Sequence, residues 1–240
     1  MPFEPRHTWL IFLSMIAFAG AACAAPPPDT LAQRLVACVA CHGREGRATN
    51  DGYYPRIAGK PAGYLFNQLV NFRDGRRRNA AMTYLVNHQT DAYLREIAGH
   101  FAALDLPYPP PLLAKADPAV LARGERLVRQ GDTARGIPAC VACHGAELTG
   151  VEPAIPGLLG LPRDYMNAQF GAWKGGLRQA ASPDCMGDIA RKLTSEDIGA
   201  ASAWLASRPW PAAAAAAAAK PAAAAGALKL PLRCGSAGVP

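Results

Sequence analysis

The chain contains 240 residues, of which 50% are hydrophobic and 18% are charged. Its 25 Lys and Arg residues and 18 Asp and Glu residues give a formal net charge of +7 at pH 7. Outside the N-terminal region no segment is apolar for long enough to span a membrane, so the composition excludes a protein with several transmembrane helices.

Residues 1–24 have the pattern of a secretory signal peptide. Arg6 precedes an apolar stretch from Trp9 to Ala22, and Ala22-Cys23-Ala24 provides a cleavage site. The stretch is shorter than the roughly 20 residues of a transmembrane helix. We therefore expect a mature protein in the periplasm, either soluble or peripherally associated with the membrane. Two alternatives stay open, namely an uncleaved anchor and lipidation of Cys23.

A doubled C-x-x-C-H motif is the most informative feature, because the run Cys38–His42 recurs almost letter for letter as Cys140–His144. Two thiols on one helical turn can each add to a vinyl group of haem, and the adjoining imidazole can bind the iron. A thioredoxin-like motif would need a βαβ pattern, which the sequence does not show. Paired zinc-binding C-x-x-C motifs usually lie roughly 15–20 residues apart, whereas nearly a hundred residues separate the two motifs here. We predict two covalent c-type haems, bound through Cys38, Cys41, His42, Cys140, Cys143 and His144.

The predicted haems would lower the net charge of the mature protein. Removal of residues 1–24 takes away one acidic and one basic residue, so the mature chain keeps its net charge of +7. Four haem propionates would lower it towards about +3, which removes the main support for nucleic-acid binding. The cluster of Arg73, Arg76, Arg77 and Arg78 has three interpretations: it steers an acidic partner, lies beside a propionate, or ends a helix in solvent.

An internal repeat at a distance of 101 to 104 residues predicts two copies of one unit. We expect one domain at 30–105 and a second at 117–210, joined by a proline-rich linker at 106–116 and followed by an Ala- and Pro-rich tail at 211–240. The matched pairs are Pro55 with Pro156, Gly59 with Gly160, Tyr64 with Tyr165, Gln68 with Gln169, Phe72 with Trp173 and Gly75 with Gly176.

Apolar spacing and capping residues predict helices in both units, and no segment alternates convincingly with a period of two. One helix runs from a cap at Asp29 or Thr30 into the first motif, and its counterpart is capped by Asp117. The other predicted helices cover 61–74, 90–104, 162–174 and 194–207. The fold class is therefore all-α, and each unit is so small that haem must supply much of its core.

A second axial ligand for each iron must come from elsewhere in its unit. Met82 and Met186 follow the motif histidines by 40 and 42 residues, in predicted loops, and a thioether is a suitable ligand. His88 and His100 are the rival ligands in the first unit. We interpret Met166, on a predicted helix, as a core residue.

With these residues the chain resembles the dihaem cytochrome c4 family, which consists of tandem class I cytochrome c domains. The resemblance covers roughly residues 30–210 and depends on the paired motifs, the runs at 55–59 and 156–160, the aromatic helix and the methionines. It implies thioether bonds at the four motif cysteines, and iron ligation by His42, Met82, His144 and Met186. It also implies that the carbonyls of Pro55 and Pro156 accept a hydrogen bond from each proximal imidazole.

The resemblance implies an electron carrier rather than an enzyme, because His and Met would fill both axial positions. Its partners would be a respiratory complex or periplasmic dehydrogenase, and a terminal oxidase or another cytochrome. An alternative is a dihaem oxidoreductase such as a thiosulfate dehydrogenase, with Cys185 on the iron. A further alternative is a dedicated haem subunit of a dehydrogenase.

Cysteine counting predicts a disulfide. Of the seven cysteines, Cys23 leaves with the signal peptide and four bind haem, so Cys185 and Cys234 remain as a pair in an oxidising compartment. Their disulfide would fasten the tail beside the second methionine.

Overall fold

The computed structural model describes residues 29–49, 51–111, 116–211 and 230–237. The predicted signal peptide, with Cys23, lies outside these ranges, as do parts of the predicted linker and tail. The chain divides into a short unit, Met1–Arg34, and a large unit, Leu35–Pro240. Within the described ranges no helix has the length and apolar character needed to cross a membrane.

The described part of the short unit contains one helical turn, α1 (Leu31–Arg34). The Thr30 hydroxyl accepts a hydrogen bond from the Gln33 amide at 3.2 Å, as expected of a cap. A single helix into the first motif was predicted and is wrong, because the next helix begins only at Val36. Leu35 separates the two with a ψ of −1°, far from the helical value of about −42°.

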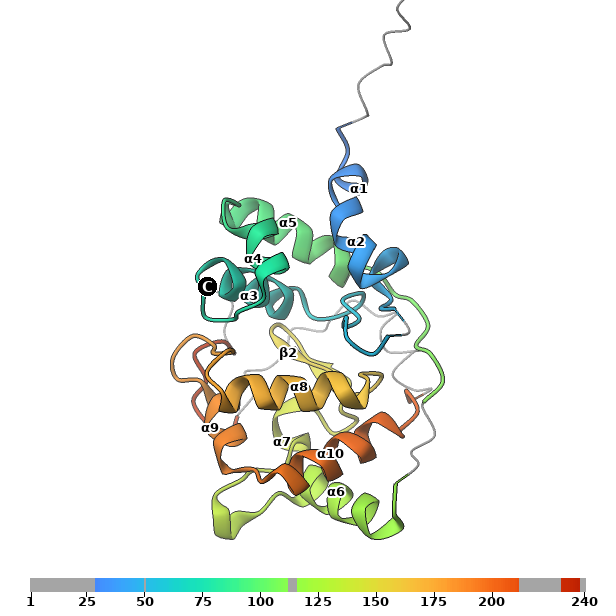
Figure 1. Ribbon diagram of the computed structural model, residues 1–240, viewed down its shortest axis with the longest axis vertical. Coiled ribbons are helices and arrows are strands. Elements are labelled where there is room, and N and C mark those ends of the chain that lie inside the picture. The colour runs from blue at the N-terminus through green and yellow to red at the C-terminus, as the bar shows by residue number, and fades with distance from the viewer. Residues whose placement is uncertain (1–28, 50, 112–115, 212–229, 238–240) are drawn as a thin grey trace, which may run out of the picture. The chain divides into compact units, whose positions relative to one another are not determined.

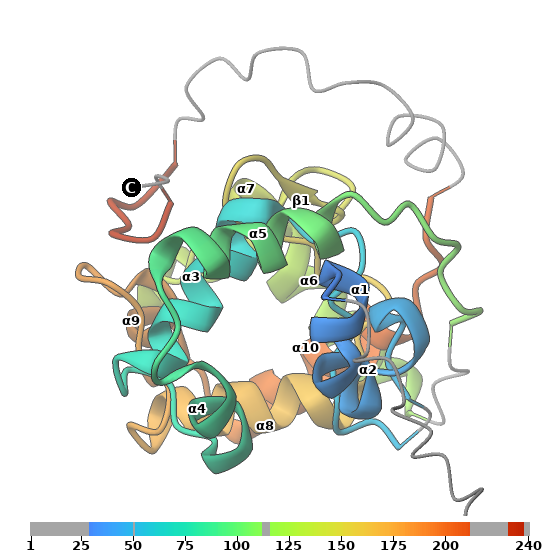
Figure 2. The same cartoon turned by 90° about the horizontal axis from the view of Figure 1, so that it is seen from above.

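The first repeat of the large unit contains α2 (Val36–His42), a 3-10 turn η1 (Arg44–Gly46), α3 (Ala62–Arg73), α4 (Ala80–Val86) and α5 (Asp91–Ala102). Helix α3 packs against both α4 and α5 (Figure 1 and Figure 2). Polar contacts accompany the buried apolar side chains: the Thr83 hydroxyl of α4 donates to the Phe72 carbonyl at 3.2 Å, and Arg73 pairs with Asp91 of α5. The buried core residues of this repeat include Leu65, Phe66, Phe72, Leu94, Ile97 and Phe101.

The second repeat contains α6 (Pro118–Gln130), a 3-10 turn η2 (Thr133–Arg135), α7 (Val141–His144), β1 (Gly150–Val151), β2 (Ile155–Pro156), α8 (Arg163–Lys174), α9 (Cys185–Lys192) and α10 (Ser195–Ala206). Helix α10 packs against α6 and α8. Asp117 caps α6 through a 2.7 Å bond from the Ala119 amide. The core includes Leu127, Val128, Leu159, Met166, Ile198, Trp204 and Leu205.

The all-α fold class is confirmed, with one addition. Strands β1 and β2 form a two-stranded antiparallel hairpin in which Gly150 pairs with Pro156 and Val151 with Ile155. These strands are only two residues long, too short to show an alternating pattern in the sequence.

The two repeats are joined at a symmetric contact within the large unit. Arg77 and Arg178, which occupy equivalent positions of the repeat, form an antiparallel bridge. The Arg78 amide donates to the Leu177 carbonyl at 2.8 Å, and the Gln179 amide donates to the Arg76 carbonyl at 2.7 Å. The 101-residue repeat of the sequence is thus also a local two-fold relation in space.

Candidate haem sites

The first C-x-x-C-H motif lies on α2. His42 is buried, and its Nδ1 donates a hydrogen bond to the Pro55 carbonyl at 2.9 Å. This bond fixes the tautomer and the plane of the ring and leaves Nε2 for a metal. Cys38 and Cys41 are half-buried on the same helix.

The second motif repeats this arrangement at the start of α7, where Cys140 precedes the helix and Cys143 lies within it. His144 is buried, and its Nδ1 donates to the Pro156 carbonyl, in β2, at 2.7 Å. Both hydrogen bonds that the resemblance implies are therefore present, one in each repeat.

Burial lowers the pKa of both imidazoles. For His42 the bond to Pro55 opposes this effect and the positive charge of Arg77 adds to it. For His144 the bond to Pro156 opposes it and the charge of Lys60 adds to it. Both rings are held neutral, which is the form that can bind iron. Burial also raises the pKa of the Cys140 thiol to about 11, so this thiol is protonated at neutral pH.

The two methionines lie on helices, so their predicted loop positions were wrong. Met82 is in α4, where the Asn79 side chain caps the helix by accepting from the Met82 amide at 3.1 Å. Met186 is in α9, which Asp184 caps by accepting from the Gly187 amide at 3.0 Å. Each short helix begins at a polar cap that precedes its methionine, a signal that was present in the sequence.

The two rival ligands of the first repeat lie after α4 and within α5. His88 is exposed in the turn after α4, and His100 is half-buried in the last turn of α5. Met166 is 4% exposed and belongs to the core of the second repeat, as expected.

The residues present fit a haem in each repeat. A buried neutral imidazole with one nitrogen fixed, next to a pair of unpaired thiols, is the donor set of a c-type haem. Within the described residues, the buried indole nitrogen of Trp173 has no hydrogen-bond partner. Such a group calls for an acceptor that the polypeptide does not provide, and a haem carboxylate is one.

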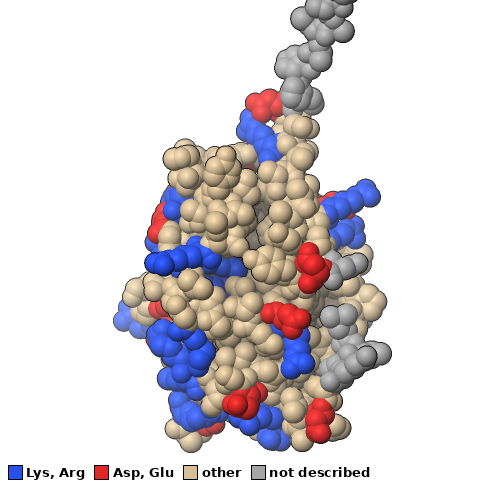
Figure 3. Space-filling view, in the orientation of Figure 1, with Lys and Arg blue, Asp and Glu red and all other residues tan. Residues whose placement is uncertain are grey.

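Two members of the arginine cluster form ion pairs within the protein. Arg73 pairs with Asp74 and Asp91, and Arg76 also pairs with Asp74. In Figure 3 many Lys and Arg side chains lie along the left and lower left of the face, and most Asp and Glu side chains lie to their right. Two of the three interpretations, steering of an acidic partner and a helix end in solvent, therefore suit the exposed Arg78 better than the other arginines.

Arg77 has a different role at the contact between repeats. Its guanidinium donates to the side-chain oxygens of Gln68 at 2.9 Å and Gln169 at 2.7 Å. Arg178 donates to the same two oxygens, at 3.1 Å and 2.7 Å respectively. The buried Arg178 and the half-buried Arg77 share neutral acceptors, and their charges outweigh burial to lower the pKa of the Tyr165 phenol. The role of Arg178 was not predicted from the sequence, because its partner Gln68 lies in the other repeat.

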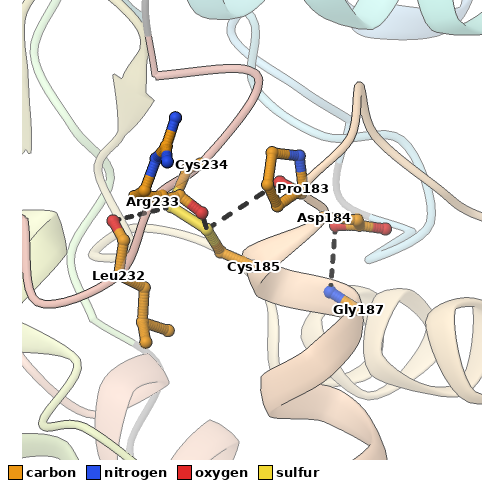
Figure 4. The surroundings of a disulfide bond; sticks show 7 residues. All are labelled: Pro183, Asp184, Cys185, Gly187, Leu232, Arg233 and Cys234. Carbon is orange, nitrogen blue, oxygen red and sulfur yellow. Dashed lines mark hydrogen bonds between the residues drawn. A yellow bond between two sulfur atoms is a disulfide. The ribbon is translucent and has the colours of Figure 1, made fainter.

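The predicted pair of cysteines is joined in the structure by a disulfide between Cys185, the first residue of α9, and Cys234 of the tail (Figure 4). The Gly235 amide donates to the Pro183 carbonyl at 3.0 Å, and the Asn67 side chain donates to the Ser236 carbonyl at 3.0 Å. The tail segment 230–237 therefore contacts both the start of α9 and helix α3 of the first repeat.

Comparison with known proteins gives consistent relatives, although no family model matches the chain. It is 38% identical over 194 residues to the thiosulfate dehydrogenase electron acceptor of Thiomonas intermedia, covering 80% of this chain and 85% of the relative. It is 33% identical over 174 residues to cytochrome c4 of Pseudomonas aeruginosa, covering 72% and 84%. The crystal structure of reduced cytochrome c4 from Pseudomonas stutzeri superposes with a TM-score of 0.61 at 29% identity, covering 72% of this chain and 94% of that one.

Proposed function

The chain belongs to the dihaem cytochrome c4 family, and on that premise we propose that it carries electrons in the periplasm from a dehydrogenase to an oxidase or another cytochrome. Two covalently bound haem c groups supply the one-electron chemistry. The observation that carries the proposal is the pair of buried imidazoles, each bonded to a proline carbonyl in its own repeat.

The chain's residues hold and tune these groups. The four motif cysteines would form the thioethers. The carbonyls of Pro55 and Pro156 orient the two histidine rings, and burial favours the neutral form of both. Met82 and Met186 would each supply a thioether sulfur to one iron, which would leave no position for a substrate and would raise the reduction potential. A protein of this kind exchanges electrons with transient partners.

We infer that the donor is a thiosulfate dehydrogenase, because a relative with 38% identity is named as the electron acceptor of such an enzyme. The alternative, in which this chain is itself the dehydrogenase, requires the sulfur of Cys185 on the second iron. That sulfur is bonded to Cys234 in the structure, which favours the carrier. A dedicated haem subunit would copurify with its dehydrogenase, whereas a free carrier would not.

One experiment tests the ligands and the donor together. The oxidised holoprotein should show the weak long-wavelength band of Met-ligated ferric haem, and thiosulfate with a thiosulfate dehydrogenase should reduce both haems. Met82→Ala and Met186→Ala should each remove about half of the band and lower one of the two potentials, because each removes one axial thioether.

Met166→Leu is the matched control, because it changes a buried methionine of the same repeat as Met186 and should leave the band intact. A band of undiminished strength in Met186→Ala, together with a haem spectrum that changes in Cys185→Ser, would contradict the carrier proposal and favour the enzyme. Reduction without thiosulfate would show that the observed transfer does not come from the dehydrogenase reaction.

A further inference from the structure

Lys60 is a buried lysine that reaches from the first repeat to the second. Its side chain is 3% exposed, and its Nζ donates to the Gly157 carbonyl at 3.2 Å. It lies between Gly59, whose amide donates to the Phe101 carbonyl, and Pro61, which precedes α3. Its burial and its bond to the Gly157 carbonyl keep the ammonium away from solvent.

The surroundings of this ammonium are cationic or neutral. The Arg56 guanidinium lies on the ring of Tyr108, and the same ring lies 5.7 Å from the Lys60 Nζ. Arg56 is itself bonded to the carbonyls of Ala58, Leu106 and Pro107. No carboxylate of the described residues forms an ion pair with Lys60, so its charge is uncompensated by the polypeptide.

The charge lies behind the proximal side of the second haem site. Gly157, the acceptor for Lys60, directly follows Pro156, whose carbonyl accepts from His144 Nδ1 at 2.7 Å. Lys60 also contributes, after burial, to the low pKa of His144. The position equivalent to Lys60 in the second repeat is Leu161, which is uncharged and packs on the apolar core. The cation therefore breaks the symmetry between the two sites.

We propose that Lys60 is a positioning and tuning residue that raises the reduction potential of the second haem and couples its reduction to proton uptake. The proposal rests on the proposed carrier function. A nearby cation destabilises ferric iron more than ferrous iron, because the ferric state has one more positive charge. When the donor protein supplies one electron, the local positive charge falls by one. A neutral Lys60 amine can then bind a proton from solvent, and it releases that proton when the acceptor removes the electron.

The coupling operates near neutral pH. Burial, together with the charge of Arg56, lowers the pKa of Lys60 to about 7. The other titratable groups that face it are Arg56, Tyr108 and His144, and only the amine of Lys60 changes charge in this range once His144 is bound to iron. The potential of the second haem should thus be highest at acidic pH and fall as the pH rises through neutrality.

The test is a redox titration of the holoprotein at acidic, neutral and mildly alkaline pH, with the two haems assigned through the Met82→Ala and Met186→Ala variants. At acidic pH, Lys60→Met should lower the reduction potential of the second haem and so shift the electron-exchange equilibrium about tenfold towards reduction of the first haem. For one electron this is equivalent to ~59 mV. The pH dependence of the second potential should disappear. Lys60→Arg should keep the high potential without the pH dependence, because guanidinium does not titrate in this range.

Lys192→Met is the matched control, since this exposed lysine of the second repeat also donates to a carbonyl, that of Gly136, at 2.8 Å. It should change neither potential. A second-haem potential that is unchanged in Lys60→Met, or equal shifts at both haems, would overturn the proposal. Such a result would leave the carrier function intact as long as both Met-ligated bands persist, so the two failures are distinguishable.

Discussion

At the scale of single residues, Asp197 illustrates how charge holds the second repeat together. Its carboxylate is 2% exposed and pairs with Arg123 and Arg135, both at 2.7 Å. It also accepts from the Thr194 amide at 3.0 Å, which closes a capping box at the start of α10. Burial alone would raise the pKa of Asp197, but the two arginines outweigh it and hold the pKa well below its ordinary value.

Asp197→Asn should therefore lower the free energy of unfolding at neutral pH by about 2 kcal/mol. This is less than the ~3–5 kcal/mol of a fully buried pair, because the arginines are partly exposed and can be hydrated. Since the folded pKa is depressed, this stability is present above the unfolded pKa of about 4 and is lost as the pH falls below it. Urea unfolding at neutral and acidic pH measures both effects.

Asp188→Asn is the control at this scale. Asp188 pairs with Arg191 on the surface of α9, where both side chains are more than half exposed. Exposed pairs contribute little, so the variant should unfold like the parent. Equal destabilisation by the two substitutions would contradict the importance assigned to burial of Asp197.

At the scale of elements, the close crossing of α6 and α10 depends on Gly124. A Cβ on Gly124 would lie 2.2 Å from the Ala200 carbonyl oxygen, so Gly124→Ala forces the helices apart. We expect a loss of ~1–3 kcal/mol in the free energy of unfolding, as for other overpacked cores. Thermal or urea unfolding measures it.

Gly199→Ala, on α10 itself, is the matched substitution. A Cβ there meets nothing within 4 Å, so helix propensity alone should make the protein more stable by ~0.5–1 kcal/mol. Opposite signs at the two glycines are the expected outcome. If both variants were stabilised, the crossing would not be as close as the structure has it.

Helix positions were predictable where local chemistry marks the ends. Asp117 was predicted as a cap and is one, and the helices predicted from positions 90 and 194 begin one residue later, after caps at Thr90 and Thr194. The short helices α4 and α9 were taken for loops, because an apolar period cannot be recognised in so few residues. The break at Leu35 depends on a single backbone torsion and has no signal in the sequence.

The residues of the candidate sites could also be predicted only in part. The motif cysteines and histidines could be identified because covalent haem attachment fixes their spacing, and the resemblance to the cytochrome c4 family, now confirmed, supplied the prolines. Lys60 and Arg178 could not be assigned a role, because their partners lie about a hundred residues away in the other repeat. Contacts between repeats depend on how the two copies pack, and sequence spacing does not encode that packing.

At the scale of the whole molecule, the tail segment 230–237 is joined to the second repeat by a covalent bond and to the first by a hydrogen bond. The disulfide between Cys185 and Cys234 closes a loop with a sequence separation of 49 residues. Two hydrogen bonds also join the tail to the protein. The Gly235 amide donates to the Pro183 carbonyl, and the Asn67 side chain of α3 donates to the Ser236 carbonyl. Opening the disulfide should release the tail from both repeats at once, because no buried apolar cluster of the described residues includes the tail.

Cys234→Ser should therefore lower the free energy of unfolding by ~2–4 kcal/mol, the usual contribution of a disulfide that closes a long loop. Protection of the Gly235 amide from hydrogen exchange should be lost, because its bond to Pro183 depends on the tether. Ser236→Ala is the control, since only the backbone carbonyl of that residue is used, by Asn67. Cys234→Ser could instead unfold like the parent while the Gly235 amide loses its protection. The disulfide would then constrain the tail without stabilising the fold, and the predicted contribution of ~2–4 kcal/mol would be wrong.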